Sequence, residues 1–160
     1  MASLKGGDAL KRRLANMAKK LDGAQEVRVG FLEGATYPDG TPVATVAAAN
    51  EFGRPDKGQP PRPFFRQTIE QNSPNWGRQI GKLLKANDSD SAAALEAMGS
   101  VIKGQLQRSI NQFTSPPLAP STIAAKGFDK PLILTAHMLR SVDFEVVGTH
   151  DKEGSSDEPA

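Results

Sequence analysis

The sequence predicts an α+β fold in which a small antiparallel sheet packs with several helices joined by long proline-rich loops. Three observations predict it. Apolar residues alternate with other residues in two short segments, 27–32 and 142–147, as in strands with one buried face. Elsewhere apolar residues recur at three- and four-residue steps over helical lengths. Twelve prolines and fifteen glycines, many of them clustered, mark the connections.

The chain has 160 residues, which suits one domain. We predict a single α+β domain over residues 1–148 and a disordered acidic tail over residues 149–160, because the tail is polar and lacks an apolar anchor. The absence of cysteine excludes disulfides and thiolate metal sites. No apolar stretch is long enough to cross a bilayer and the N-terminus has no signal-peptide core, so no membrane partner is expected.

Residues 8–23 predict a basic amphipathic helix, with Asp8 as N-cap and Gly23 as the stop. Its apolar stripe consists of Leu10, Leu14, Met17 and Leu21. Its outer face carries the candidates for contact with a DNA-filled lumen or an acidic partner: Lys11, Arg12, Arg13, Lys19 and Lys20. An ordinary solvated helix face is the alternative reading of these charges.

The middle of the chain reads as a turn, a short helix and a loop. Tyr37–Gly40 has the Pro-Asp-Gly order of a turn. Thr41 is the expected cap of a helix that has Pro42 at its first position and Gly53 at its end. Residues 54–63 are rich in proline, glycine and charge and predict an exposed loop.

The second half of the chain predicts mainly helices. One begins at Phe64, with a break or kink expected at Ser73-Pro74. The strongest pattern predicts a helix from about Ser91 to Gln112. After a loop come two short predicted helices, Ser121–Lys126 and Ala136–Ser141, the second capped by Thr135 and burying Met138 and Leu139.

Catalytic and metal-binding patterns are weak, so we expect no enzyme, no cofactor and no metal. Thr135 and His137 could form a nucleophile–base pair, but no third orienting group or oxyanion loop accompanies them. Asp88 and Asp90 resemble one edge of a calcium loop that lacks its bidentate glutamate. The glycines do not follow a phosphate-binding motif.

Several segments instead combine aromatic or apolar residues with proline, glycine and arginine, which is typical of interface anchors. Of the adjacent Phe64 and Phe65, we expect one core residue and one interface anchor, with stacking on nucleic-acid bases as the alternative. The subunit-interface candidates are Phe52, Arg62, Pro63, Phe64, Phe65, Arg66, Lys126, Leu132, Met138 and Arg140.

An ordered set of motifs over about residues 25–147 resembles the neck and tail-completion proteins of long-tailed bacteriophages, including the group akin to the Mu virion-morphogenesis protein. The motifs are VRVGF at 27–31, YPDGTPVA at 37–44, NEFG at 50–53, PPRPFFR at 60–66, LAPSTIAAKG at 118–127 and KPLILTAHMLRS at 130–141. One departure stands at Thr135-Ala136, where the family usually has Thr-Gly. If that position needs a positive φ, alanine is strained there.

The resemblance implies a structural virion protein that joins heads to tails during virion assembly as a neck or tail-completion subunit of a homo-oligomeric ring, with a hexamer as one arrangement. It implies head-completion or connector proteins on one side, tail terminator or tail tube proteins on the other, and genomic DNA in the lumen. Assembly would take place in the host cytoplasm. A tail terminator or tail-tube-associated subunit is the alternative within the virion. A DNA-binding accessory protein that uses the basic helix is the alternative from another class.

Overall fold

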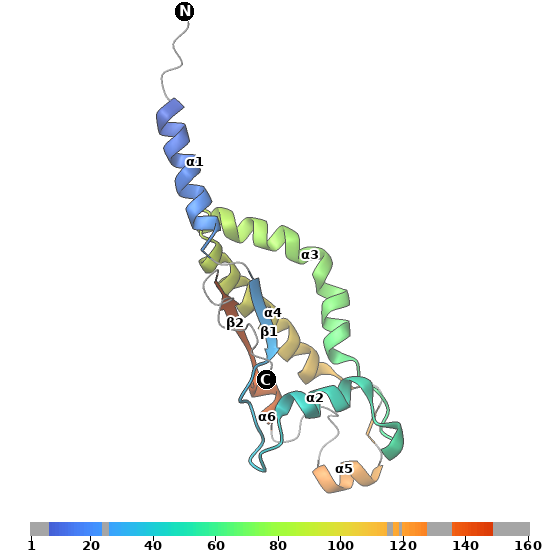
Figure 1. Cartoon of the computed structure of the whole chain (residues 1–160). Helices are drawn as coiled ribbons and strands as arrows, with labels where there is room; N and C mark the ends of the chain where they lie inside the picture. The colour runs from blue at the N-terminus through green and yellow to red at the C-terminus, as the bar shows by residue number, and fades with distance from the viewer. Residues whose placement is uncertain (1–6, 24–25, 115–116, 119, 128–135, 149–160) are drawn as a thin grey trace, which may run out of the picture. The chain divides into compact units, whose positions relative to one another are not determined.

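The computed structural model describes residues 7–23, 26–114, 117–118, 120–127 and 136–148. Within them lie six α-helices, one short 3-10 helix and a sheet of two antiparallel strands, which confirms the α+β class (Figure 1). In chain order the elements are α1 (Gly7–Leu21), β1 (Glu26–Phe31), α2 (Val43–Phe52), η1 (Pro55–Lys57), α3 (Phe64–Ala86), α4 (Ser91–Gln112), α5 (Pro120–Lys126), α6 (His137–Arg140) and β2 (Val142–Val147). The predicted tail, 149–160, lies outside the described residues.

The two strands pair as the alternating patterns predict. Along β2, Val142 and Val147 are buried, whereas Asp143 and Glu145 are exposed. The Arg28 side chain of β1 contacts Glu26 on its own strand at 2.7 Å and Glu145 on β2 at 3.5 Å. These ion pairs join exposed side chains, whereas Val142, which lies on the other face of β2 from Glu145, is fully buried.

The described parts of the chain group into two compact units, and the border between them falls inside α3, α4 and both strands. One unit takes in Val29–Trp76 and Ser100–Phe144. The other takes in Met1–Arg28, Gly77–Gly99 and Glu145–Ala160.

The Val29–Trp76 and Ser100–Phe144 unit holds the main hydrophobic core. Phe64 of α3 is fully buried and meets Phe31 edge to face, with ring centroids 6.4 Å apart. The buried cluster comprises Val43, Ala47, Phe64, Leu106, Ile110, Phe113, Met138 and Val142. The core therefore draws on segments far apart in sequence, and α4 supplies it at the helical spacing predicted for residues 91–112.

The other unit is packed more thinly. Its buried apolar side chains are Ala94, Met98 and Val147. Ser91 Oγ donates to the Lys20 carbonyl oxygen at 2.9 Å, which fixes the last turn of α1 against the start of α4. No residue of α1 itself is buried.

The predicted caps need correction. Asp8 lies within the first turn of α1, where a carboxylate still favours the positive end of the helix dipole. Pro42, not Thr41, is the N-cap of α2, because the Thr41 amide donates to Asp39 Oδ1 at 2.9 Å and belongs to the preceding turn. Gly53 ends α2 with φ 75°, as predicted.

Of the break or kink predicted at Ser73-Pro74, the break is wrong, because α3 continues through Pro74. The α3 ribbon nevertheless bends partway along its length (Figure 1), which agrees with the predicted kink. Proline removes one backbone donor from the helix interior, but neighbouring contacts can hold the turn. Here Trp76 Nε1 donates to Gln105 Oε1 at 3.0 Å, which fixes the following turn of α3 to α4. The border between the compact units follows Trp76.

The proline-rich segment 54–63 is only partly the exposed loop that was predicted. It contains η1, and Arg54 pairs with Gln59 in a single antiparallel bridge. Its end folds back on α2, where the Arg62 amide donates to the Asn50 carbonyl oxygen at 2.7 Å. A Cβ at Gly53 would lie 2.7 Å from the Pro61 nitrogen, so this close approach requires glycine.

The predicted strain before the last helix is confirmed. Ala136 has φ 56° and ψ 12°, which is the left-handed region that alanine rarely adopts. It stands at the N-cap of α6, while the predicted cap, Thr135, lies outside the described residues.

Candidate functional site

Two of the predicted interface residues are core residues. Phe64 is fully buried and Met138 is 2% exposed, and both belong to the main cluster. Their assignment to an interface is therefore wrong. Phe64 is the core member of the predicted Phe64–Phe65 pair, and Phe65 is half-buried and packed against the same cluster.

The motifs at 50–53 and 60–66 meet each other through Glu51. This carboxylate, only 6% exposed, accepts hydrogen bonds from the backbone amides of Phe65 at 2.9 Å and Arg66 at 3.2 Å. It also accepts one from Arg66 Nε at 2.8 Å. Glu51 thus caps the N-terminus of α3 from α2, where its charge favours the helix dipole. The sequence analysis missed this role, because the partners stand fourteen and fifteen residues away.

The same two motifs leave an arginine–aromatic pair in contact with solvent. Phe52 is 67% exposed, and the Arg66 guanidinium lies over its ring, 5.3 Å from the centroid. Because Glu51 fixes Arg66, this pair is held in place before any partner arrives. Phe52 and Arg66 remain interface candidates.

The other interface candidates have different surroundings. Pro63 is half-buried and Arg140 is exposed. Arg62 is only 5% exposed, and its Nε has no hydrogen-bond partner within the described ranges. The side chain of Lys126 and all of Leu132 lie outside the described residues.

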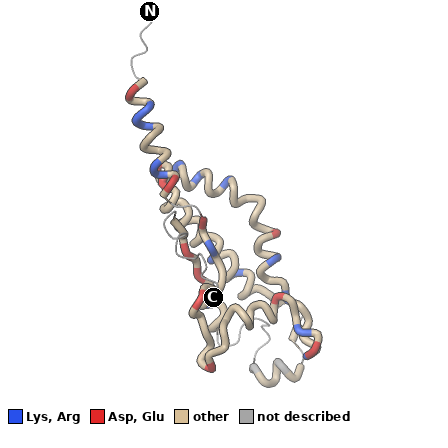
Figure 2. The backbone as a smooth tube through the Cα atoms, in the orientation of Figure 1, with Lys and Arg blue, Asp and Glu red and all other residues tan. Residues whose placement is uncertain are grey.

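Helix α1 presents a second surface. Its apolar stripe is uncovered: Leu10 is 59% exposed, Leu14 56%, Met17 37% and Leu21 46%. Lysines and arginines recur along the same helix (Figure 2). All five predicted basic candidates, Lys11, Arg12, Arg13, Lys19 and Lys20, are exposed. The helix therefore offers apolar and basic groups together.

A hollow of about 920 Å³ lies beside α1 within the same compact unit. Four of the basic candidates line it, together with Lys85 from the end of α3. Lys20 pairs with Asp88 at 2.6 Å, and that hydrogen bond lowers the pKa of the Asp88 carboxyl below its usual range. The sequence did not indicate Lys85, and it suggested Asp88 only as part of a calcium loop, because only the fold brings the end of α3 beside α1.

The residues considered for catalysis or metal binding have structural partners. His137 Nε2 lies 2.8 Å from the Thr36 carbonyl oxygen, and its ring packs on Tyr37 with centroids 4.7 Å apart. Asp90 Oδ1 accepts from the Ala93 amide at 3.0 Å at the start of α4. Within the described ranges, no group of three or more histidine, aspartate or glutamate side chains could hold a metal ion.

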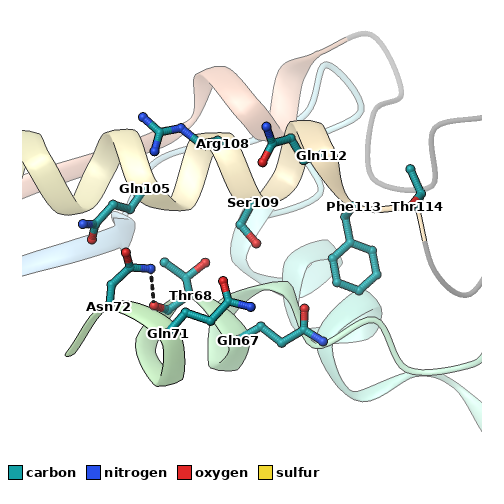
Figure 3. A pocket seen from close by; sticks show the side chains of 10 residues that line it. All are labelled: Gln67, Thr68, Gln71, Asn72, Gln105, Arg108, Ser109, Gln112, Phe113 and Thr114. Atoms are coloured by element: carbon teal, nitrogen blue, oxygen red, sulfur yellow. Dashed lines mark hydrogen bonds between the residues drawn. The ribbon is translucent and has the colours of Figure 1, made fainter. Parts of the chain in front are cut away.

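A polar cleft of about 410 Å³ lies between α3 and α4 in the unit that holds the main core (Figure 3). Its lining is made mainly of amides and hydroxyls: Gln67, Thr68, Gln71, Asn72, Gln105, Arg108, Ser109, Gln112, Phe113 and Thr114. Asn72 Nδ2 donates to the Thr68 carbonyl oxygen at 2.8 Å. These ten side chains include no carboxylate or imidazole, so they supply no acid–base pair.

No helix in the described part of the chain has the length and apolar character needed to cross a membrane. Comparisons of this chain with protein-family models, with curated proteins and with solved structures each found no match.

Proposed function

We propose that this chain is a structural subunit that works by docking onto other protein subunits, at the head–tail junction of a tailed bacteriophage. The observation that supports docking is α1, which carries four large apolar side chains that remain 37–59% exposed. Burial of such side chains is worth about 25 cal/mol per Å² removed from water, so a partner that covers them gains affinity. The virion assignment rests on the resemblance of the motifs between residues 25 and 147.

The charge of α1 narrows the kind of partner. The apolar stripe favours a protein surface over DNA, since charged phosphates cannot form apolar contacts with leucine or methionine side chains. The basic residues favour a partner surface that is acidic around an apolar centre. In the virion such a surface belongs to a neighbouring copy in the ring, to a head-completion or connector protein, or to a tail terminator or tube protein.

The rival reading is a DNA-binding accessory protein, which the five basic side chains beside the hollow favour. The two proposed functions require different side chains of α1. Binding to DNA needs the positive charges and weakens steeply with salt, whereas docking to a protein needs the apolar stripe as well.

Two matched variants test the proposal in particle assembly. One replaces Leu10 and Leu14 by glutamine and keeps every charge; the other replaces Arg12 and Arg13 by glutamate and keeps the stripe. Both pairs are exposed, so the isolated chain should fold in each case. Electron microscopy of particles made with the stripe variant should show filled heads and separate tails. Normally joined particles from that variant would refute the docking role of α1.

The same variants separate the two classes of function in a gel-shift assay. If the chain is a DNA-binding accessory protein, the charge-reversed protein loses DNA binding and the stripe variant keeps it, while head–tail joining depends on the charges alone. Loss of joining in the stripe variant, with DNA binding unchanged, is the result expected for the docking role.

A further inference from the structure

Two arginines stand four residues apart in the PPRPFFR motif, and their surroundings are opposite. Arg66 has a 60% exposed side chain, yet it is paired with Glu51 and stacked on Phe52. Arg62 is 95% removed from solvent, yet its Nε has no hydrogen-bond partner, and the ion pairs found among the described residues do not include it. Buried charges in proteins are almost always paired.

The electrostatics of Arg62 agree with that geometry. Burial lowers the pKa of its guanidinium, and no carboxylate in the described part of the chain offsets the effect. Arginine stays protonated even so, because its ordinary pKa is above 12. Among the described residues, the positive charge of Arg62 therefore has no carboxylate partner, although little of this residue is exposed to solvent.

The backbone keeps Arg62 there. Its amide donates to the Asn50 carbonyl oxygen at 2.7 Å, and its carbonyl oxygen accepts from the Phe64 amide at 2.8 Å. The preceding residue, Pro61, lies against Gly53, and Pro63 follows, which restricts the backbone of Arg62 to extended conformations. The backbone of Arg62 is thus held in position before a ligand binds, which lowers the entropy cost of binding.

We infer that Arg62 is the receptor of an oxyanion-binding site, and that its ligand is a carboxylate carried by another protein chain. A guanidinium presents planar N–H donors that match the two oxygens of a carboxylate. Such a ligand supplies the missing counter-charge and hydrogen-bond acceptors together.

This inference makes an unusual prediction about the isolated chain. Replacing an uncompensated buried charge by an apolar side chain of similar length removes a desolvation penalty, so Arg62→Met should stabilise the protein. We expect a rise in Tm of about 2–4 °C, the shift that roughly 1 kcal/mol produces in a chain of this size. Arg66→Met is the matched control and should lower Tm, because it leaves the Glu51 carboxylate buried without its cation.

Binding is tested directly on the full chain by nuclear magnetic resonance of the arginine Nε–H groups, with sodium acetate as the probe and sodium chloride at equal ionic strength as the reference. The Arg62 signal should shift and saturate with acetate, and not with chloride, while the Arg66 signal stays in place. If the Arg62 signal does not saturate with acetate, or if Arg62→Met lowers Tm, then Arg62 is already compensated and the inference is wrong.

Sedimentation of the wild type and of Arg62→Met identifies the source of the carboxylate. Self-association that is present in the wild type and lost in the variant assigns the carboxylate to a second copy of the chain. Equal sedimentation of both proteins, together with saturable acetate binding, assigns it to a different chain. Neither result bears on the docking role of α1, because Leu10 and Leu14 are unchanged in Arg62→Met. That role is tested separately with the Leu10 and Leu14 variant.

Discussion

Helices α1 and α4 carry the same kind of sequence pattern, but the apolar face of α4 is buried and that of α1 is exposed. Both have large apolar residues at three- and four-residue steps. In α4, Met98, Leu106 and Ile110 are 1–2% exposed, whereas in α1 the corresponding stripe is 37–59% exposed. Periodicity thus shows that a helix has an apolar face, and says nothing about what covers it. The apolar face of α1 remains exposed, in contrast to that of α4, and we therefore expect a partner to bind at α1.

The largest expected effect is a direct test of this contrast with the same substitution in both helices. Leu106→Ala should lower the free energy of unfolding by about 2–5 kcal/mol, because it opens a cavity in the core. Leu14→Ala should change it by no more than about 0.5 kcal/mol, since an exposed leucine has little burial to lose. Urea unfolding of both proteins measures the difference. Similar losses would mean that α1 is covered in the isolated chain.

The next effect concerns how the two motifs of the core unit are held together. Glu51→Gln keeps the shape of the side chain but removes the charge that faces two backbone amides and Arg66. We expect a loss of about 1.5–3 kcal/mol, the range for hydrogen bonds to a charged group. Glu70→Gln, at an exposed position of α3, is the control and should be nearly neutral. A neutral Glu51→Gln would show that Glu51 is not the cap of α3.

A smaller effect, with the opposite sign, is expected at Ala136. Its φ of 56° is unfavourable for any residue with a Cβ. Ala136→Gly should therefore stabilise the chain by about 0.5–1 kcal/mol, after subtraction of the extra backbone entropy of glycine. Thermal unfolding measures the gain. Ala48→Gly, at an exposed position within α2, should lose about 1 kcal/mol and controls for glycine itself.

The smallest effect is the pH dependence of the contact that holds the end of α1. The hydrogen bond from Lys20 lowers the pKa of Asp88, with its charge and that of Arg13 as further causes. A lowered folded-state pKa gives stability that is present above the unfolded-state pKa and is lost as pH falls through the folded-state pKa. Lys20→Met should raise the pKa of Asp88 in a carbon-detected carboxyl titration. An unchanged value would show that the ion pair does not form in solution.

Local patterns predicted much of the fold. The strands, the bounds of α4 and the stop of α2 at Gly53 follow from spacing and backbone preference. The strained position at residue 136 was expected from the family resemblance, which has glycine there. The errors lie where neighbours in space override such preferences. Pro74 does not interrupt α3, so only a kink is compatible with it there. Thr41 belongs to the turn before α2, whose N-cap is Pro42.

Some features of the candidate site could be predicted from the sequence, and others depend on the fold. The basic stripe of α1 was readable from sequence, because its residues stand on one helix. Of the motif residues between 50 and 66, the sequence indicated their importance but not their separate roles. Glu51 and Arg66 are partners that stand on different helices, so their contact depends on the fold. The Nε of Arg62 has no hydrogen-bond partner among the described residues, which is also a consequence of the fold.

The sequence by itself determined the α+β class, the amphipathic helices and the contrast between a basic start and an acidic end, because periodicity and charge are local properties. Only the tertiary structure decided that Phe64 and Met138 are core residues, that Phe52 is exposed, and that the buried Arg62 finds no hydrogen-bond partner for its Nε among the described residues. Burial depends on which segments meet, and those meetings join residues that are distant along the chain.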